Sequence, residues 1–262
     1  MKKLHVISLL AALSNPLHAG SMGSDEIASF DGAYLGVGTG FISLFNNDNF
    51  RTQRSNSTRV AGGGEVNRYT DTAIQFNGNL GYGKMMPKKT YLGAKASIYY
   101  SPIQLAGETN YSIPLGTNVI TGTNTIRTNL KPIYNIDGVL GYELFPHLLS
   151  FVEAGVSFSN VTRNYEFSRS YANLTTPADT FRYSYLLNLN AYKTSYNVGV
   201  GLNYLLHDNF FLSFEVLYND LSKRTGESST LMGDTGVSER QSRTVYSNAV
   251  SAFASASYLF NI

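Results

Sequence analysis

Apolar and polar residues alternate along eight stretches of this chain. Successive side chains of a β-strand point to opposite faces, so strict alternation predicts strands that have two different environments. Asp137 and Glu143 occupy polar positions of one such stretch, where an ordinary core would not tolerate unpaired carboxylates. The expected strands are residues 33–43, 74–82, 92–100, 134–143, 152–159, 196–204, 212–219 and 250–260.

The connections between these stretches alternate between short and long. The short ones lie near residues 85–89, 145–148 and 206–210, and the long ones cover 44–71, 101–131, 160–191 and 219–245. Long connections rich in Asn, Ser, Thr, Gly and Arg argue against a compact soluble domain, but they are expected on the outer side of a transmembrane barrel. An open sheet edge in hydrocarbon would leave backbone groups unpaired, so the sheet must close.

The expected fold is therefore all-β: an eight-stranded antiparallel transmembrane up-and-down β-barrel with four long extracellular loops and both termini periplasmic. If the loops add strands to the wall, the likeliest source is TNVITGTNTI in the second long loop. The interior of an eight-stranded barrel is just filled by side chains, which argues against a wide pore.

The residue types decide which face is outside. The polar positions are mostly Gly, Ser and Asn with a few charges, which suits the crowded interior of a narrow barrel, whereas the apolar positions suit lipid. Aromatic residues on the apolar face are expected to form the two belts at the membrane interfaces. The belt near the short turns comprises Tyr82, Tyr142, Tyr204 and Tyr258, and the belt near the long loops comprises Tyr100, Tyr134, Phe158 and Tyr218.

The charged residues on the polar face predict a network inside the barrel. Lys95, Glu153 and Glu215 each follow a short turn by a similar number of residues, so they should lie at similar depth. Glu143 and Glu153 lie on consecutive strands of one hairpin and are expected to be neighbours. Buried charges persist only when paired, so we expect a polar network, with a static plug favoured over a gate or an ion path. Its members are Lys95, Asp137, Glu143, Glu153, Glu215, Gln75, Asn79 and Asn135.

The N-terminus has the layout of a secretory signal peptide. Met1, Lys2 and Lys3 precede a short apolar run from Leu4 to Leu13, and cleavage is expected after Ala19. Residues 1–19 form the expected leader and residues 20–262 the barrel. The leader holds two lysines and no acid, so the mature chain has 18 basic and 18 acidic residues, which argues against binding to nucleic acid. Cysteine is absent, which excludes disulfides and thiolate metal sites.

The leader, the opening AYLGVGTG, the eight alternating stretches and the closing SASYLF together resemble the small outer-membrane β-barrels, in particular the OmpA-like transmembrane barrel and the opacity-type surface proteins. The resemblance covers essentially the whole mature chain and rests on pattern. It implies a bacterial outer membrane with its lipid and lipopolysaccharide, and a C-terminal assembly signal at Tyr258 and Phe260 that the barrel-assembly machinery recognises. The chain departs from the family by continuing through Asn261 and Ile262. It stops after the eighth expected strand, so the peptidoglycan-binding domain of full OmpA proteins is not expected.

The expected function is that of a surface protein whose extracellular loops contact host or cell-surface ligands, with a part in envelope structure. The alternative is a porin-like channel for small solutes or ions. No enzyme activity, cofactor or metal is expected, because His147 and His207, the histidines left after cleavage, fall in short turns far from an outer catalytic rim. Cations of the fourth long loop, including Lys223 and Arg243, are interpreted as solvated loop charges, with contact to lipopolysaccharide phosphates as the alternative.

Overall fold

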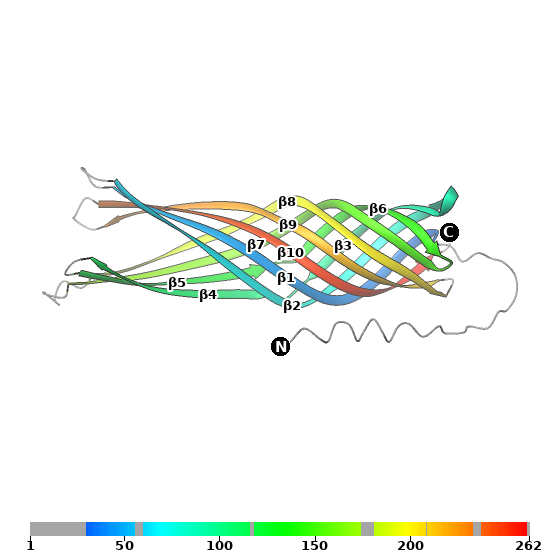
Figure 1. Cartoon of the computed structure of the whole chain (residues 1–262), viewed down its shortest axis with the longest axis horizontal. Coiled ribbons are helices and arrows are strands. Elements are labelled where there is room, and N and C mark those ends of the chain that lie inside the picture. Colours follow the sequence, from blue (N-terminus) through cyan, green and yellow to red (C-terminus); the bar gives the residue numbers. More distant parts are fainter. Residues whose placement is uncertain are drawn as a thin grey trace, which may run out of the picture.

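The computed structural model describes residues 30–55, 60–115, 118–173, 181–207, 209–232 and 237–260, with only the backbone described at some positions of the outer strands (Figure 1). The expected leader therefore lies outside the described residues. None of the helices in these ranges is long and apolar enough to cross a membrane. The elements are β1 (Gly32–Ser55), β2 (Val60–Met86), the short 3-10 turn η1 (Pro87–Lys89), β3 (Thr90–Tyr100), β4 (Gln104–Leu115), β5 (Asn118–Leu130), β6 (Ile133–Phe145), β7 (Leu148–Asn173), β8 (Phe181–His207), β9 (Phe210–Met232) and β10 (Val237–Phe260).

The antiparallel sheet closes in a ring. The pairing runs from β1 through β2, β3, β6, β7, β8, β9 and β10, and β10 pairs with β1 again from Ala33↔Phe260 upward. Ring closure leaves no open edge at this depth, which is what hydrocarbon requires of a spanning sheet.

The described chain contains ten strands where the sequence predicts eight. The two additional strands, β4 and β5, come from the second long connection, which is the segment expected to add strands. They pair with each other, and β5 pairs with the outer part of β7. β4 follows β3 after Ser101–Ile103, and β5 leads into β6 across Lys131 and Pro132. Pro102 and Pro132 stand in these two interruptions, and proline cannot donate a hydrogen bond to a ladder.

The described residues do not confirm the expectation of four long extracellular loops, because paired strands continue into the segments expected to be loops. β1 and β2 stay paired as far as Ser55↔Val60, and β7 and β8 as far as Tyr171↔Phe181. These outer segments lack apolar alternation, because a strand outside the bilayer has water on one or both faces. Main-chain hydrogen bonds continue the ladder there without an apolar pattern, and composition cannot distinguish such a strand from a loop.

A broad apolar band covers the outside of the ring. The side chains of Val37, Leu80, Ile136 and Val200 are 69%, 58%, 57% and 56% exposed. Continuous apolar surface of this extent marks contact with a membrane or a partner. The band follows the paired part of the ring on every strand, so it is the lipid-facing surface of a membrane-spanning barrel.

The lumen contains two apolar layers besides the expected polar residues. One layer lies toward the short turns and comprises Phe30, Tyr91, Val139, Leu149, Phe151, Leu205, Phe211 and Leu259. The other lies toward the outer end and comprises Ile42, Leu44, Tyr99, Ile103, Leu130, Ile133, Val161, Leu217, Leu221, Ala249 and Phe253. The expectation of an interior filled by small and polar residues alone therefore needs correction. Apolar side chains can fill a narrow closed cylinder without needing hydrogen-bond partners.

The outer half of the barrel divides into two four-stranded arms, which diverge in Figure 1 at the end away from the C-terminus. The β2–β3 ladder ends at Phe76↔Tyr100, and the β8–β9 ladder ends at Asn197↔Asn219. Beyond these points β9, β10, β1 and β2 form one sheet, here called the first arm, and β4, β5, β7 and β8 form the second arm. The gap between β8 and β9 is called the β8/β9 seam.

Candidate functional site

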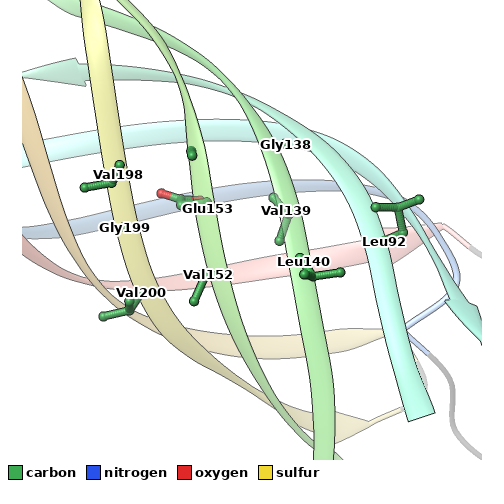
Figure 2. Close-up of a pocket in the computed structure, with 10 residues that line it drawn as sticks. Leu92, Gly138, Val139, Leu140, Val152, Glu153, Val198, Gly199 and Val200 are labelled. Carbon is green, nitrogen blue, oxygen red and sulfur yellow. The ribbon is translucent and has the colours of Figure 1, made fainter. Parts of the chain in front are cut away.

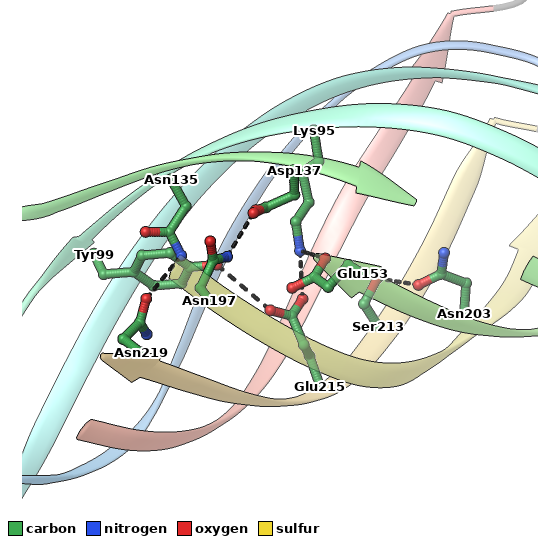
Figure 3. Close-up of polar contacts among 10 residues, drawn as sticks. All are labelled: Lys95, Tyr99, Asn135, Asp137, Glu153, Asn197, Asn203, Ser213, Glu215 and Asn219. Carbon is green, nitrogen blue, oxygen red and sulfur yellow. Dashed lines mark hydrogen bonds and ion pairs between the residues drawn. The ribbon is translucent and has the colours of Figure 1, made fainter. Parts of the chain in front are cut away.

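Lys95 lies at the centre of a buried ion network in the lumen (Figure 3). Its Nζ lies 2.8 Å from Oε2 of Glu215 and also forms an ion pair with Glu153. The Tyr99 hydroxyl donates to Oε1 of Glu215 at 3.4 Å. The side chains come from β3, β7 and β9, so one ammonium group connects three walls of the barrel.

Glycines make room for the two acidic side chains that reach into this narrow space. Gly199 lies opposite Glu153 on β8, and a Cβ there would lie 2.8 Å from Oε1 of Glu153. Gly155 lies opposite Asp137 on β7, and a Cβ there would lie 2.4 Å from Oδ1 of Asp137. These two glycines therefore allow the carboxylates of Glu153 and Asp137 to pack closely against the opposite strand.

Amides and hydroxyls extend the polar layer beyond the ions. Asn197 donates to Asp137, and Asn135 donates to Oδ1 of Asn219 at 3.1 Å. The Ser157 hydroxyl lies 2.7 Å from Oδ1 of both Asn135 and Asn219. Asn197, Asn219 and Ser157 are missing from the predicted network, although each occupies a polar position of an alternating stretch and so carried the same signal.

The structure places most of the predicted network residues in this lumen. Lys95, Glu153, Glu215, Asp137 and Asn135 lie together as described. Gln75 and Asn79 on β2 are buried as well, with 1% and 8% of their surface exposed. No hydrogen bond is described between either of them and the Lys95 cluster.

Glu143 is apart from this network. It pairs with Leu149 near the short turn, whereas Glu153 pairs with Val139, so the two glutamates are not neighbours. Glu143 is six residues beyond Asp137 along β6, which is about 20 Å at the usual rise per residue. Alternation identified its face of the strand correctly but could not identify its depth.

We expect Glu143→Gln to change the free energy of unfolding by less than about 0.5 kcal/mol, because the half-exposed carboxylate has no described partner to lose. Chemical denaturation of the refolded barrel in detergent measures this. Glu153→Gln is the matched comparison and should destabilise clearly more. If both substitutions lowered the free energy of unfolding equally, Glu143 would have to be counted as part of the network.

A second buried cluster joins the two arms just above the outer apolar layer. Nε of Arg243 on β10 lies 2.8 and 2.7 Å from the two carboxylate oxygens of Asp48 on β1. The guanidinium group also lies 3.9 Å from the ring centre of Tyr165 on β7. Arg243 is only 3% exposed, so its interpretation as a solvated loop charge was wrong.

Arg163 of the second arm completes this cluster. Its Nη2 donates to Oδ1 of Asn46 at 2.7 Å and also to the Ser247 hydroxyl, both on the first arm. Burial, reinforced by the Asp48 carboxylate, raises the pKa of Tyr165 to about 12, so that phenol stays neutral at physiological pH. These side-chain contacts hold the two arms together near the barrel, where no strand pairing joins the arms.

Arg163→Met should lower the free energy of unfolding by about 1.5 kcal/mol, because it removes charge-assisted hydrogen bonds between the arms. It should also speed hydrogen exchange in outer β7 and β10 while leaving the lipid-facing segments protected. Exchange followed by mass spectrometry measures both regions in one sample. Uniform protection in both arms of the variant would contradict this role.

The predicted interface aromatics lie on the outer surface. Tyr82, Tyr100, Tyr134, Tyr142, Phe158, Tyr204 and Tyr258 are between 39% and 56% exposed, and Tyr218 is half-buried. Near the C-terminus, the Tyr258 ring packs edge-on against Phe260, with the ring centres 4.8 Å apart. Residues 261 and 262 lie outside the described residues. The assembly role of Tyr258 and Phe260 remains a prediction.

A hollow of about 450 Å³ lies on the wall of the barrel and is shown in Figure 2. Its exposed lining residues, including Leu140, Val152 and Val198, are apolar, and the small residues Gly138 and Ala154 line it as well. It faces the bilayer, so acyl chains can fill it, and it offers no arrangement of groups for catalysis.

The described residues offer no metal site. No group of three or more His, Asp or Glu side chains among them is arranged to hold a metal ion. His147 and His207 are exposed near short turns. The prediction that the chain is not an enzyme is not tested by these observations.

No protein-family model and no curated protein matches the chain. Solved structures of similar fold include the outer membrane protein OprG from Pseudomonas aeruginosa, with 11% identity, a TM-score of 0.45 and coverage of 88% of this chain and 97% of that one. The attachment invasion locus protein Ail of Yersinia pestis has 13% identity, a TM-score of 0.28 and coverage of 84% and 99%. The outer membrane protease OmpT from Escherichia coli has 11% identity, a TM-score of 0.35 and coverage of 87% and 97%.

A β-sheet can span a bilayer only as a closed ring, because an open edge would leave backbone groups unpaired in hydrocarbon. Closed rings of antiparallel strands with an apolar outer band are typical of bacterial outer membranes. The chain is therefore a β-barrel of the bacterial outer membrane. The OmpA-like resemblance in particular stays a prediction.

Proposed function

We propose that this chain is a surface protein: a sealed barrel that anchors two β-sheet arms for contact with ligands outside the cell. The filling of the lumen carries this proposal. Two apolar layers lie on either side of the Lys95 network, and side chains such as Ile42, Leu149 and Leu217 are completely buried. Ions cannot cross apolar layers of this kind without large desolvation costs, so the porin-like alternative is disfavoured.

The arms supply the surface for contact. They extend well beyond the apolar band, and Arg163 and Arg243 fasten their bases. The chain therefore combines a rigid barrel, which anchors it in the membrane, with two arms that can contact ligands outside it. An adhesin or another contact protein requires both parts. Lipid, lipopolysaccharide, the barrel-assembly machinery and host or cell-surface ligands are the partners proposed for it. Nucleic-acid binding and enzyme activity form no part of the proposal.

Conductance and binding tested together distinguish the two functions. The refolded protein should be silent in a planar bilayer, and cells that display it should gain adherence to surfaces or neighbouring cells. In a shortened variant, residues 52–63 and 168–184 are each replaced by Asn-Gly, which closes both hairpins at paired positions. Adherence should be lost while the barrel still folds. Discrete large conductance steps would favour the channel, and unchanged adherence of the shortened variant would contradict a contact role for the arms.

A further inference from the structure

The buried cluster of Asp48, Arg163 and Arg243 at the base of the arms, here called the Arg163 cluster, holds more positive than negative charge. Among its described side chains, two are guanidinium groups and one is a carboxylate, so two positive charges and one negative charge leave a net charge of +1. All three side chains are at most 3% exposed and are shielded from bulk water. A buried charge without a counter-charge is costly, so the excess calls for a compensating group.

Arg163 is the cation that the carboxylate does not neutralise. The two carboxylate oxygens of Asp48 lie 2.8 and 2.7 Å from Nε of Arg243, and Oδ2 pairs with Nη2 of the same guanidinium group. Arg163 forms no ion pair with another described residue. Its hydrogen-bond partners include the neutral oxygens of Asn46 and Ser247. The guanidinium group of Arg163 is therefore buried among neutral acceptors.

The remaining neighbours of Arg163 do not supply the missing negative charge. Tyr165 also hydrogen-bonds to Arg163, but its phenol stays neutral because burial raises its pKa to about 12. Burial lowers the pKa of the Arg163 guanidinium, and the nearby Arg243 adds to this effect. A lowered pKa is the direction expected of a buried cation that has too little negative charge around it.

Hydrogen-bond donors are left over beside this cation. Nε and Nη1 of Arg163 have no hydrogen-bond partner among the described residues, and neither has Nδ2 of Asn46. Oδ1 of Asn46 accepts from Nη2 of Arg163 at 2.7 Å and from the Ser247 hydroxyl at 2.6 Å, which ties the amide group directly to the guanidinium group. Buried donors normally have an acceptor, and beside a cation a negatively charged acceptor forms the stronger bond.

The Arg163 cluster is closed toward the membrane and lacks strand pairing toward the outside. The outer apolar layer lies below it, and Val161 and Leu221 of that layer are completely buried. Beyond Asn197↔Asn219 no strand pairing closes the β8/β9 seam, and the arms diverge outward from there (Figure 1). An ion can therefore reach the cluster from the outer side without having a path through the barrel.

We infer that the Arg163 cluster binds one small monovalent anion of the external medium, such as chloride. The anion accepts charge-assisted hydrogen bonds from Arg163 and a further hydrogen bond from Asn46, and it brings the charge of the cluster to zero. Charge balance favours a monovalent ion, and the burial of both donor residues favours a small one. The site lies between the bases of the arms, so it goes beyond the surface contact proposed for them.

Chloride-dependent unfolding tests this inference. The refolded barrel is unfolded with urea in sodium chloride and in sodium gluconate at equal ionic strength, since gluconate is too large for a buried site. Chloride should raise the urea midpoint, because a ligand that binds only the folded state stabilises it. Arg163→Met should abolish this chloride-specific rise. Arg127→Met is the matched control, because it removes an exposed arginine of β5 in the same arm, and it should keep the rise.

Asp48→Asn distinguishes an anion site from a purely structural cluster. It removes the carboxylate and raises the net charge of the cluster to +2, so the urea midpoint in gluconate should fall. The chloride concentration that gives half of the midpoint rise should nevertheless fall about tenfold, because the cations then attract an anion more strongly. If Asp48→Asn does not refold, the comparison of Arg163→Met with Arg127→Met decides alone.

Two results would overturn the proposal. An equal chloride-specific rise in the wild type and in Arg163→Met would mean that water alone satisfies the leftover donors. A refolded Asp48→Asn variant with unchanged or weaker chloride affinity would mean that the charge of the cluster does not attract an anion. Neither result changes the expected bilayer silence or the adherence test, so the two proposals fail separately.

Discussion

Replacing Lys95 with methionine is expected to lower the free energy of unfolding by about 3–5 kcal/mol, because it leaves Glu153 and Glu215 buried without their cation. The two carboxylates are only 3% and 9% exposed, and apolar layers lie on both sides of them along the barrel. Water therefore cannot screen the charge that the substitution leaves. Reversible urea unfolding of the refolded barrel in detergent or in lipid vesicles gives the free energy directly.

Two controls separate charge from packing. The triple variant Lys95→Met, Glu153→Gln and Glu215→Gln removes the unpaired charge and should recover much of the loss, since neutral amides can hydrogen-bond in the same space. Lys131→Met removes an exposed lysine and should change stability by less than about 0.5 kcal/mol. If the Lys95→Met and Lys131→Met variants had the same free energy of unfolding, the ion network would not stabilise the barrel.

Ile136→Arg should cost about 2–4 kcal/mol, because it places a guanidinium group against acyl chains inside the apolar band. Ile136 is 57% exposed and lies between Tyr134 and Tyr142 of the two aromatic belts on the same strand. In water an exposed arginine at such a position would be nearly neutral. The same unfolding measurement must therefore be made in lipid vesicles, where the hydrocarbon environment is present.

Thr70→Arg is the matched control for this substitution. Thr70 is also exposed on the outer surface, but it lies on β2 six residues beyond Phe76, above the outer belt. Arginine there should cost no more than about 1 kcal/mol, since the penalty falls toward the interface. Similar costs at positions 70 and 136 would mean that the apolar band does not contact lipid.

Alternation was enough to predict the wall of the barrel. Leu80, Ile136 and Val200 stand at apolar positions of the sequence, and all three face outward in the structure. The period of two is a local property, so it can be read without knowing which strands pair. The ring closure followed from the same face assignment, because a spanning sheet in lipid has no alternative to closing.

Depth within the lumen was harder to predict than face. Lys95, Glu153 and Glu215 meet because each lies at a similar distance from a short turn, and that distance can be counted in the sequence. For Glu143 the count fails, since it lies almost at the turn itself, where it pairs with Leu149. Register between strands depends on strand tilt and turn geometry, which a face pattern does not contain.

The features that the sequence could not reveal depend on long-range pairing. Asp48 and Arg243 lie 195 residues apart, in segments whose polar composition suggested loops. They become neighbours only because β1 and β10 continue their ladder above the membrane. The outer apolar layer, with Ile42 and Leu217, was missed for a related reason. Its residues stand near the ends of the alternating stretches or just beyond them, where the pattern of alternation is lost.

Quenching of single tryptophans by brominated lipids tests the central claim most directly, because the chain has no tryptophan of its own. Leu140→Trp and Thr70→Trp are refolded into vesicles whose acyl chains carry bromine at mid-chain. Strong quenching of tryptophan at position 140 and weak quenching at position 70 is the predicted result. Tryptophan at position 140 that resists brominated lipid and is quenched by aqueous iodide would contradict a lipid-facing apolar band and, with it, the membrane-spanning barrel.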